Sequence, residues 1–203
     1  MKTFPTPLLT ALLTALLLPF LAVSCNVLKP VEDSSVNYLL DSAVPERAIT
    51  GASPAVAIAS PALPGYLDRQ QLVSRSGDGE LLMNPNHLWG EPLDSGIARV
   101  TAANLGRLKN SLNIQPVKSF VTLDYQSLLE IRITRFEPDG SGSIVLACTW
   151  KLQPVSGPVA TTRAFTTRVP LAAAADPLGS QTGRVQAMNE ALARLARQIA
   201  KSL

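Results

Sequence analysis

The stretch SLLEIRITRFEPDGSGSIVLACTWKL, residues 127–152, decides the fold. Its first half alternates apolar and polar residues (129–134), which is the two-residue period of a strand with one covered face. The segment EPDGSG (137–142) has the composition of a tight turn, and residues 144–152 then repeat the alternation. The stretch therefore predicts an antiparallel hairpin.

Sequence on both sides of this hairpin extends the β pattern. Downstream, the turn QPVSGP leads into VATTRAFTTRV (159–169), which predicts a third strand of an antiparallel meander. Upstream, QQLVSR (70–75) and ELLMN (80–84) flank the glycine-containing turn SGDGE and predict a second hairpin. VNYLL (36–40) predicts a first strand, and the apolar segment around 55–60 predicts a strand buried on both faces.

Two segments have a helical period instead. The first is EPLDSGIARVTAANLGRLKNSL (91–112), with apolar residues on one arc at Ile97, Val100, Leu105, Leu108 and Leu112. The second is TGRVQAMNEALARLARQIAKSL (182–203), whose stripe consists of Val185, Met188, Leu192, Leu195 and Ile199. Because a sheet with one apolar face needs a cover, we predict a single α+β domain, a largely antiparallel sheet covered on one face by two principal helices.

The N-terminus predicts export. A basic residue, Lys2, precedes an apolar run that ends in LAVSC (21–25), where small residues lead to Cys25. The run contains Pro19 and is shorter than the roughly 20 residues of a membrane-spanning helix. We expect a lipoprotein signal with acylation of Cys25; ordinary secretion and an uncleaved anchor are the alternatives.

This interpretation divides the chain into three parts. Residues 1–24 are the lipoprotein signal peptide, 25–35 form a lipidated tether, and 36–203 form the folded domain. If Cys25 carries lipid, the only other cysteine, Cys148, has no disulfide partner. Cys148 lies in an apolar strand pattern, which predicts a small buried hydrophobic residue and no disulfide.

Charge and composition argue against nucleic-acid binding. The net charge is +3 and the isoelectric point is about 9.1, but the basic residues are scattered along the chain rather than clustered. A nucleic-acid footprint requires a concentrated basic patch. Membrane association is therefore assigned to the acyl chains on Cys25.

Residues that could carry catalysis are scarce. The single histidine, His87, excludes a two-histidine zinc site and is most simply a loop residue beside Trp89. Neither a G-x-S-x-G elbow nor a phosphate-binding G-x-x-x-x-G-K-[ST] loop occurs. The acidic residues Asp68, Asp78, Glu80 and Glu91 show no spacing that singles out a pair. The sequence predicts neither an enzyme nor a cofactor or metal site.

Several segments carry a family resemblance. LPGYLDRQQLVSR (63–75) is followed by HLWGEPL (87–93), DYQSLLEIRITRFEPDGSG (124–142) and VQAMNEALARLARQIA (185–200). In this order they resemble the ABC-type transport auxiliary lipoproteins, the PqiC-like family of membrane integrity-associated transporter subunits. Asn104, within the apolar arc of the first helix, and Asn189, where a small hydroxyl residue is usual, depart from the pattern.

The resemblance implies more than the composition does. It implies a non-catalytic lipoprotein on the periplasmic face of the outer membrane, working with an MCE-domain protein and an ABC permease and ATPase in lipid transport. Asn26 after the lipidated cysteine resembles the outer-membrane sorting signal of enteric bacteria, with the inner membrane as the alternative. The resemblance is also compatible with a homo-oligomer.

Given this resemblance, YLDRQQLVSR (66–75), within the stretch 63–75, is the candidate recognition segment for a partner. Tyrosine, tryptophan and arginine are enriched at interface hot spots. The candidate residues are Tyr66, Leu67, Asp68, Arg69, Gln71, Arg75, Trp89 and Glu91. The simpler interpretation stays open, with the charged residues solvated and Trp89 closing the core at the start of a helix.

Two other functions remain open. The domain could carry a lipid directly, enclosing an acyl chain between sheet and helices. It could also be a structural lipoprotein that assists a different envelope translocon. Neither the lipid nor the direction of transport follows from the sequence.

Overall fold

The computed structural model describes residues 34–117, 124–171 and 181–203. The predicted signal peptide, Cys25 and nearly all of the tether lie outside these ranges. Most of the link before the last helix does as well. The described elements are β1 (Val36–Tyr38), β2 (Val56–Ile58), β3 (Gln71–Arg75), β4 (Leu81–Trp89), α2 (Leu93–Lys109), β5 (Ile114–Pro116), β6 (Ser127–Pro138), β7 (Ser143–Pro154), β8 (Arg163–Pro170) and α3 (Gln181–Ala200).

A five-stranded sheet contains the predicted meander. Its strand order is β5-β2-β6-β7-β8, and β6, β7 and β8 pair antiparallel as expected. The short strand β2 runs parallel to both β5 and β6, so the sheet is mixed rather than wholly antiparallel. Strand β5 was not predicted, because its three residues are too few to show a period.

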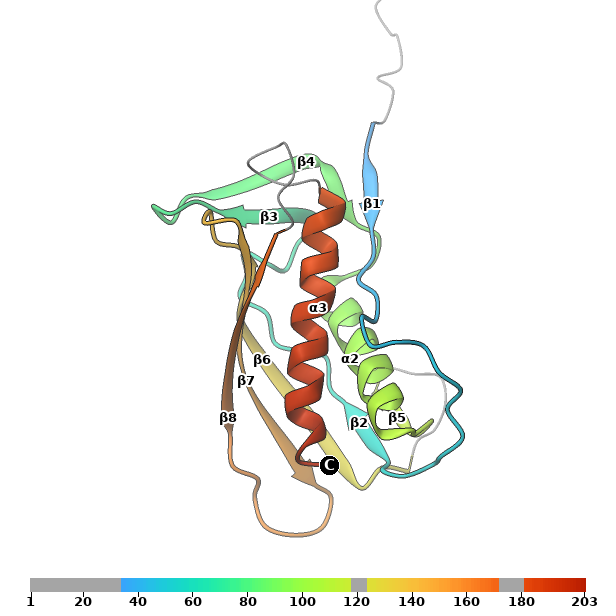
Figure 1. Ribbon diagram of the computed structural model, residues 1–203. Coiled ribbons are helices and arrows are strands. Elements are labelled where there is room, and N and C mark those ends of the chain that lie inside the picture. Colours follow the sequence, from blue (N-terminus) through green and yellow to red (C-terminus); the bar gives the residue numbers. More distant parts are fainter. Residues whose placement is uncertain (1–33, 118–123, 172–180) are drawn as a thin grey trace, which may run out of the picture. The chain divides into compact units, whose positions relative to one another are not determined.

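A three-stranded sheet with the order β1-β4-β3 lies at one end of the larger sheet (Figure 1). The predicted β3–β4 hairpin is confirmed, and β1 pairs with β4 in parallel. Strand β4 continues to Trp89, beyond the predicted segment 80–84. His87 therefore lies in a strand, not in a loop; its Nδ1 is 2.9 Å from the Tyr38 hydroxyl oxygen.

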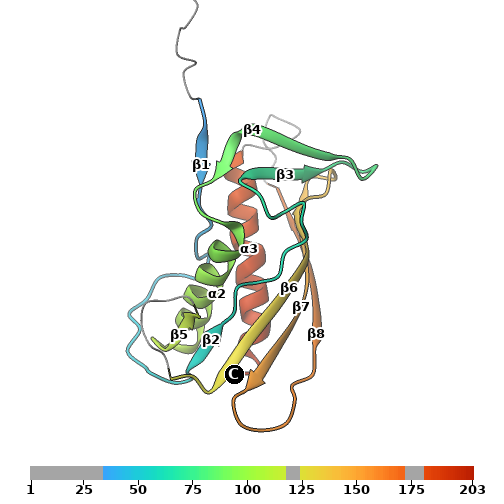
Figure 2. The ribbon, with the colours of Figure 1, turned by 180° about the vertical axis from the view of Figure 1, so that it is seen from behind.

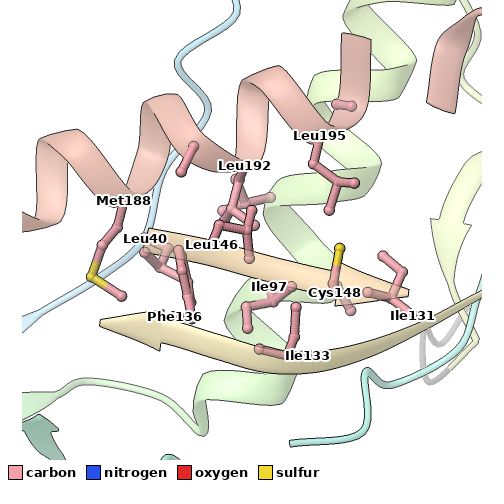
Figure 3. Close-up of a cluster of buried hydrophobic side chains, with 14 of the residues drawn as sticks. Leu40, Ile97, Ile131, Ile133, Phe136, Leu146, Cys148, Met188, Leu192 and Leu195 are labelled. Atoms are coloured by element: carbon pink, nitrogen blue, oxygen red, sulfur yellow. The ribbon is translucent and has the colours of Figure 1, made fainter. Parts of the chain in front are cut away.

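Both helices cover the same face of the five-stranded sheet (Figures 1 and 2). Helix α3 packs against β6, β7 and β8, and α2 packs beside it against α3 and β5. Figure 3 shows Leu192 and Leu195 of α3 facing Leu146 and Cys148 of the sheet. The α+β prediction with two covering helices is confirmed.

Helix α2 ends earlier than predicted. Asn110 adopts a left-handed conformation (φ 54°), and its backbone N–H donates to the Gly106 carbonyl, which closes the helix. Leu112 was predicted to lie on the apolar arc, but it falls after this cap and is 56% exposed. The buried stripe of α2 therefore ends with Leu105 and Gly106.

A β-bulge shifts the alternation of β6. The pairing with β7 changes register between Ile133 and Arg135, so that Thr134 is the extra residue. The hydroxyl of Thr134 donates to the Ala147 carbonyl across the bulge (3.0 Å). Because of the shift, Phe136 faces the core, and the next residue, Glu137, is fully buried at 0% exposure.

The segment after β1, residues 40–44, is held by both helices, and we call it the connector. From α2, Arg99 donates to the Leu40 carbonyl (2.8 Å), and Arg107 donates to the Val44 carbonyl (2.7 Å). The Asn104 Oδ1 atom accepts hydrogen bonds from the Ser42 hydroxyl and the Val44 N–H.

The second helix completes this attachment. On α3, the Asn189 Oδ1 atom accepts a hydrogen bond from the Asp41 N–H at 2.9 Å. Asn104 and Asn189 thus hold the same short segment.

Candidate functional site

Two residues of the candidate segment meet at a buried carboxylate. The Tyr66 hydroxyl donates to Glu137 Oε2 at 2.9 Å, and the Phe136 N–H donates to the same oxygen at 2.7 Å. The Arg135 Nε donates to Oε1 at 2.7 Å, and the Arg75 Nε is 3.6 Å from it. The Arg75 guanidinium also lies 5.3 Å from the centre of the Tyr66 ring. One carboxylate therefore orders both Tyr66 and Arg75.

The environment of Tyr66 keeps its hydroxyl protonated. Burial and the neighbouring Glu137 carboxylate raise the pKa of Tyr66 to about 12, although Arg75 and Arg135 act in the opposite direction. A phenol that stays neutral remains a hydrogen-bond donor to Glu137.

Two further candidate residues are part of the core. Leu67 is buried, and its neighbours in the hydrophobic cluster include Leu72 and Leu93. Trp89 is also buried at the end of β4, just before α2 begins. Because they are buried, both residues hold the candidate segment against the hydrophobic core.

The exposed candidates lie beside the β3–β4 hairpin. Asp68 and Arg69 are exposed, and Gln71 is partly exposed at the start of β3. The Arg69 Nη1 atom lies 2.8 Å from the Met83 sulfur of β4. These three residues present a small charged and polar surface next to an exposed thioether.

Glu91 lies apart from that surface, at the start of α2. Its carboxylate pairs with Arg99, the residue that also holds the Leu40 carbonyl of the connector. The structure thus brings Tyr66 and Arg75 together, places Asp68 and Arg69 nearby, and gives Glu91 separate contacts.

A pocket of about 230 Å³ opens between the β3–β4 hairpin and the β6–β7 turn. We call it the arginine pocket, because two guanidinium groups are part of its wall. Its lining residues are Ser74, Arg75, Ser76, Gly77, Leu82, Pro138, Gly140, Gly142, Leu171 and Arg184. A second cavity shares Pro138 and Arg184 with it, has mostly apolar walls, and measures only about 10 Å³.

Glu137 and Arg184 were missed by sequence reasoning. Glu137 was assigned to the turn EPDGSG, because nothing in the sequence announces the bulge that extends β6. Arg184 lies in the first turn of α3, where a charged residue is normally solvated, yet it is buried. One feature of the sequence pointed to the burial of Arg184: it directly precedes Val185, the first residue of the apolar stripe.

The described residues offer little for metal or thiol chemistry. No group of three His, Cys, Asp or Glu side chains lies close enough to hold a metal ion within the described ranges. Cys148 is buried, as predicted, and burial raises the pKa of its thiol to about 12. No helix in the described part of the chain is long and apolar enough to cross a membrane.

Comparison with protein families gives one match. A family model described as "ABC-type transport auxiliary lipoprotein component" matches residues 38–200. That range takes in every described element except the first two residues of β1. No curated protein matches the chain.

Comparison with solved structures finds a similar fold in two proteins of low sequence identity. A crystal structure of an uncharacterized protein is 19% identical, with a TM-score of 0.64, covering 83% of this chain and 97% of the other. A Xanthomonas campestris protein of the DUF330 family is 18% identical, with a TM-score of 0.64, covering 82% and 93%. A PelC dodecamer from Paraburkholderia phytofirmans is 16% identical, with a TM-score of 0.38, covering 70% and 86%.

Proposed function

The chain belongs to the family of ABC-type transport auxiliary lipoprotein components, and from this premise we propose that it is a docking subunit without catalytic activity. In this proposal, acyl chains on Cys25 hold the domain at the periplasmic face of the outer membrane. The domain then binds the distal end of an MCE-domain assembly whose ABC permease and ATPase drive lipid movement. The single observation that carries the proposal is the family match across residues 38–200.

The short length of the tether limits how far the domain can lie from its lipid anchor. Ten or so extended residues span at most about 35 Å, so the domain stays close to the bilayer. Confinement of this kind raises the effective concentration of a partner, and a modest interface then suffices. Two or more acyl chains are needed for stable attachment, which lipoprotein acylation supplies.

The candidate segment suits a docking surface. Tyr66 and Arg75 are ordered by Glu137, so the exposed neighbours Asp68 and Arg69 project from a rigid support. A preorganised surface loses less conformational entropy on binding.

The cavity between the small sheet and α3 is too small to enclose a lipid at that place, which favours docking. The apolar cavity between the small sheet and α3 measures about 10 Å³, roughly the space of one water molecule. Pockets that enclose a drug-sized ligand have about 300–1,000 Å³. An acyl chain does not fit in this cavity as it stands.

The docking proposal is tested by crosslinking in the native envelope followed by identification of the captured proteins. We expect wild-type chain to capture MCE and permease subunits, and Asp68→Ala with Arg69→Ala to reduce the capture several-fold. Arg132→Ala, an exposed arginine on β6 outside the candidate segment, is the matched control. Unchanged capture by the double variant would remove the segment from the interface, and capture of only barrel-assembly or lipopolysaccharide-export proteins would favour the translocon alternative.

The anchor is tested separately by mass spectrometry of the mature chain. The proposal expects a polypeptide that begins at Cys25 and carries the mass of the acyl groups. An unmodified N-terminus would refute the anchor, whatever the crosslinking result.

A further inference from the structure

We propose that the open edge of β8 (Arg163–Pro170) binds an extended, acidic segment of a partner protein as an additional strand of the large sheet. This inference rests on the proposed docking function and deepens it, because it names a backbone edge and the kind of segment that pairs with it. The edge is a second contact, apart from the surface at Asp68 and Arg69.

Strand β8 is the last strand of the five-stranded sheet. It pairs with β7 through all eight of its residues, and no other described strand pairs with it. Figures 1 and 2 show β8 at the outer margin of the sheet, with no described helix or strand alongside its outer edge. An edge strand presents unpaired N–H and C=O groups, which can pair with another chain.

One bond at the end of β8 shows which backbone groups face outward. The Leu171 N–H donates to the Gly142 carbonyl at 2.8 Å, so the groups of residue 171 point toward β7. Consecutive residues of an antiparallel strand direct these groups to opposite sides, and the register with β7 is regular over all eight pairs. The outward groups therefore belong to Ala164, Thr166 and Arg168, and all three residues are exposed.

Most of these outward groups are unused by the described part of the chain. The Arg194 Nη1 atom donates to the Arg168 carbonyl at 3.0 Å. The N–H and C=O groups of Ala164 and Thr166 and the Arg168 N–H have no such partner among the described residues. The open stretch 164–168 has the length of an ordinary β-strand.

The residues of β8 protect this edge by charge rather than by shape. The strand has no bulge in its pairing with β7, but it carries Arg163 and Arg168 and ends at Pro170. Charged residues and proline on an edge suppress pairing with an identical edge. The same charges favour a strand of the opposite sign.

Helix α3 lies alongside β8 and adds cations beside the edge. The Arg194 Nη1 atom donates to the Thr167 hydroxyl at 3.3 Å, and the Arg163 Nη1 atom donates to the Ser202 hydroxyl at 2.7 Å. These two contacts join opposite ends of β8 to successive parts of the C-terminal region. The basic residues of this region, which we call the basic strip, are Arg163, Arg168, Arg194, Arg197 and Lys201.

Two carboxylates neutralise part of the basic strip. Arg194 and Arg197 share Glu190, at 3.0 Å and 3.1 Å. Arg168 lies 3.5 Å from Asp139. The side chains of Arg168 and Arg197 nevertheless remain 64% and 45% exposed, so both can contact a bound segment.

The other two cations have neutral partners. Arg163 contacts the Ser202 hydroxyl and the ring of Trp150, and Lys201 contacts the Gln198 side chain. Within the described residues neither cation is paired with a carboxylate. Five positive and two negative charges leave the basic strip with a net charge of +3, which favours an acidic partner.

The basic strip lies within reach of an added strand. Neighbouring strands are about 4.8 Å apart, and side chains on adjacent strands interact in pairs. Arg163 contacts the C-terminal end of the chain on the helix side of the sheet, whereas Arg168, five residues later, belongs to the opposite face. Backbone hydrogen bonds would supply affinity, and the arginines would select aspartate or glutamate side chains on either face.

The test is site-specific photo-crosslinking in the native envelope, with the full lipidated chain. A photoactivatable residue replaces Ala164, in a chain that carries Thr166, Thr166→Pro or Thr166→Ala. The proline removes an N–H that faces away from β7, so the pairing with β7 is retained. Alanine keeps that N–H and is the matched control. Thermal midpoints check that the variants fold, and the crosslinked peptides are identified by mass spectrometry.

We expect a crosslink from position 164 to a peptide of a transport subunit that is rich in aspartate and glutamate. Its yield should fall about fivefold or more in Thr166→Pro and stay unchanged in Thr166→Ala, because only proline removes a hydrogen bond to the added strand. Equal yields in the two variants, a crosslinked peptide without acidic residues, or a peptide from a second copy of this chain would each overturn the proposal.

A charge reversal tests the basic strip without changing the backbone. Arg197→Glu should lower the crosslink yield several-fold, whereas Arg132→Glu, the same reversal at an exposed position on β6, should leave it unchanged. Equal effects of the two reversals would remove the strip from the interface.

The outcomes for the edge and for docking are separable. If Thr166→Pro lowers both the crosslink and the capture of transport subunits, both proposals are supported. If wild type captures the subunits and Thr166→Pro changes nothing, the edge fails and docking stands. If the edge binds an acidic segment of a protein outside the transport system and no transport subunit is captured, the edge stands and docking fails.

Discussion

Glu137 connects the candidate segment to the large sheet. Its carboxylate receives hydrogen bonds from Tyr66, Arg135 and the Phe136 N–H, and it is fully buried. Removing one partner of a buried charge pair leaves the other charge uncompensated, which is costly. The side chain therefore stabilises two distant parts of the chain at once.

Glu137→Gln should lower the free energy of unfolding by about 2–4 kcal/mol, because Arg75 and Arg135 lose their counter-charge. The measurement is the urea midpoint. Glu130→Gln is the matched control, since Glu130 pairs with Lys151 on the same strands but at the surface. Loss of that exposed pair should cost no more than about 1 kcal/mol. Equal effects of the two changes would contradict the assigned role of Glu137.

Tyr66 should make stability depend on alkaline pH. Its folded pKa of about 12 exceeds the ordinary value near 10, so the folded state holds this proton more tightly. The stabilising contribution is complete below about pH 10 and is lost as the pH rises toward 12. Unfolding free energies measured between about pH 9 and 11 should fall less steeply in Tyr66→Phe than in wild type. Parallel slopes would refute the coupling.

For single residues, the sequence predicted the apolar or polar character of a position better than it predicted which residues a side chain contacts. It identified Cys148 as a buried apolar residue from the alternation of β7, and this is confirmed. It did not predict that Glu137 is buried, because the bulge at Thr134 depends on pairing with β7. It noted Asn104 and Asn189 only as departures, because their partner, the connector, lies far away in sequence.

At the scale of elements, α3 supplies much of the cover for the large sheet. Leu192 is fully buried against it, whereas Gln186 on the same helix is exposed. Leu192→Ala should lower the free energy of unfolding by about 2–5 kcal/mol through lost burial and a residual cavity. Gln186→Ala should stay within about 0.5 kcal/mol of wild type. Chemical denaturation of the two variants decides the matter, and a small effect at Leu192 would contradict this packing.

The connector should open locally when its support on α2 is removed. Asn104→Ala deletes the acceptor for the Ser42 hydroxyl and the Val44 N–H, at a cost of about 1–3 kcal/mol. Hydrogen exchange at Val44 should become faster than at the centre of β7. Asn189→Ala removes one exposed bond and should have the smaller effect. Unchanged exchange at Val44 in Asn104→Ala would show that Arg107 alone is sufficient.

Elements with many residues and a clear period were predicted well, as in the β6–β8 meander and both helices. Of the three-residue strands, β5 was not predicted, whereas β1 and β2 lie within predicted segments. The direction of strands that are not joined by a short turn was also beyond the sequence. The parallel pairing of β1 with β4 and of β2 with β6 is set by the connections between them. Local periodicity carries no information about direction.

For the whole molecule, residues 35–203 form one compact unit. The predicted site of acylation lies outside it, so Cys25→Ala should change location without changing the fold. We expect the variant to leave the membrane fraction while its thermal midpoint in detergent stays that of wild type. A large drop in the midpoint would mean that the N-terminal region contributes to folding.

The family was recognisable from the order of its segments, and the match over residues 38–200 supports that recognition. The candidate site was less accessible. The sequence singled out residues 63–75, yet the structure divides them among a buried network, the core and the surface. The arginine pocket could not have been foreseen, because its wall joins Arg75 to Arg184 across more than a hundred residues.

The connector has a mechanical consequence. Any pull exerted through the N-terminus reaches β1 first, and its three residues pair with a single neighbouring strand. The next point of resistance is the group of bonds at residues 40–44, which distributes the force between two helices. Rupture under load is governed by the rate of unfolding rather than by equilibrium stability. The attachment of residues 40–44 to α2 and α3 therefore sets how long the domain withstands tension applied at its N-terminal end.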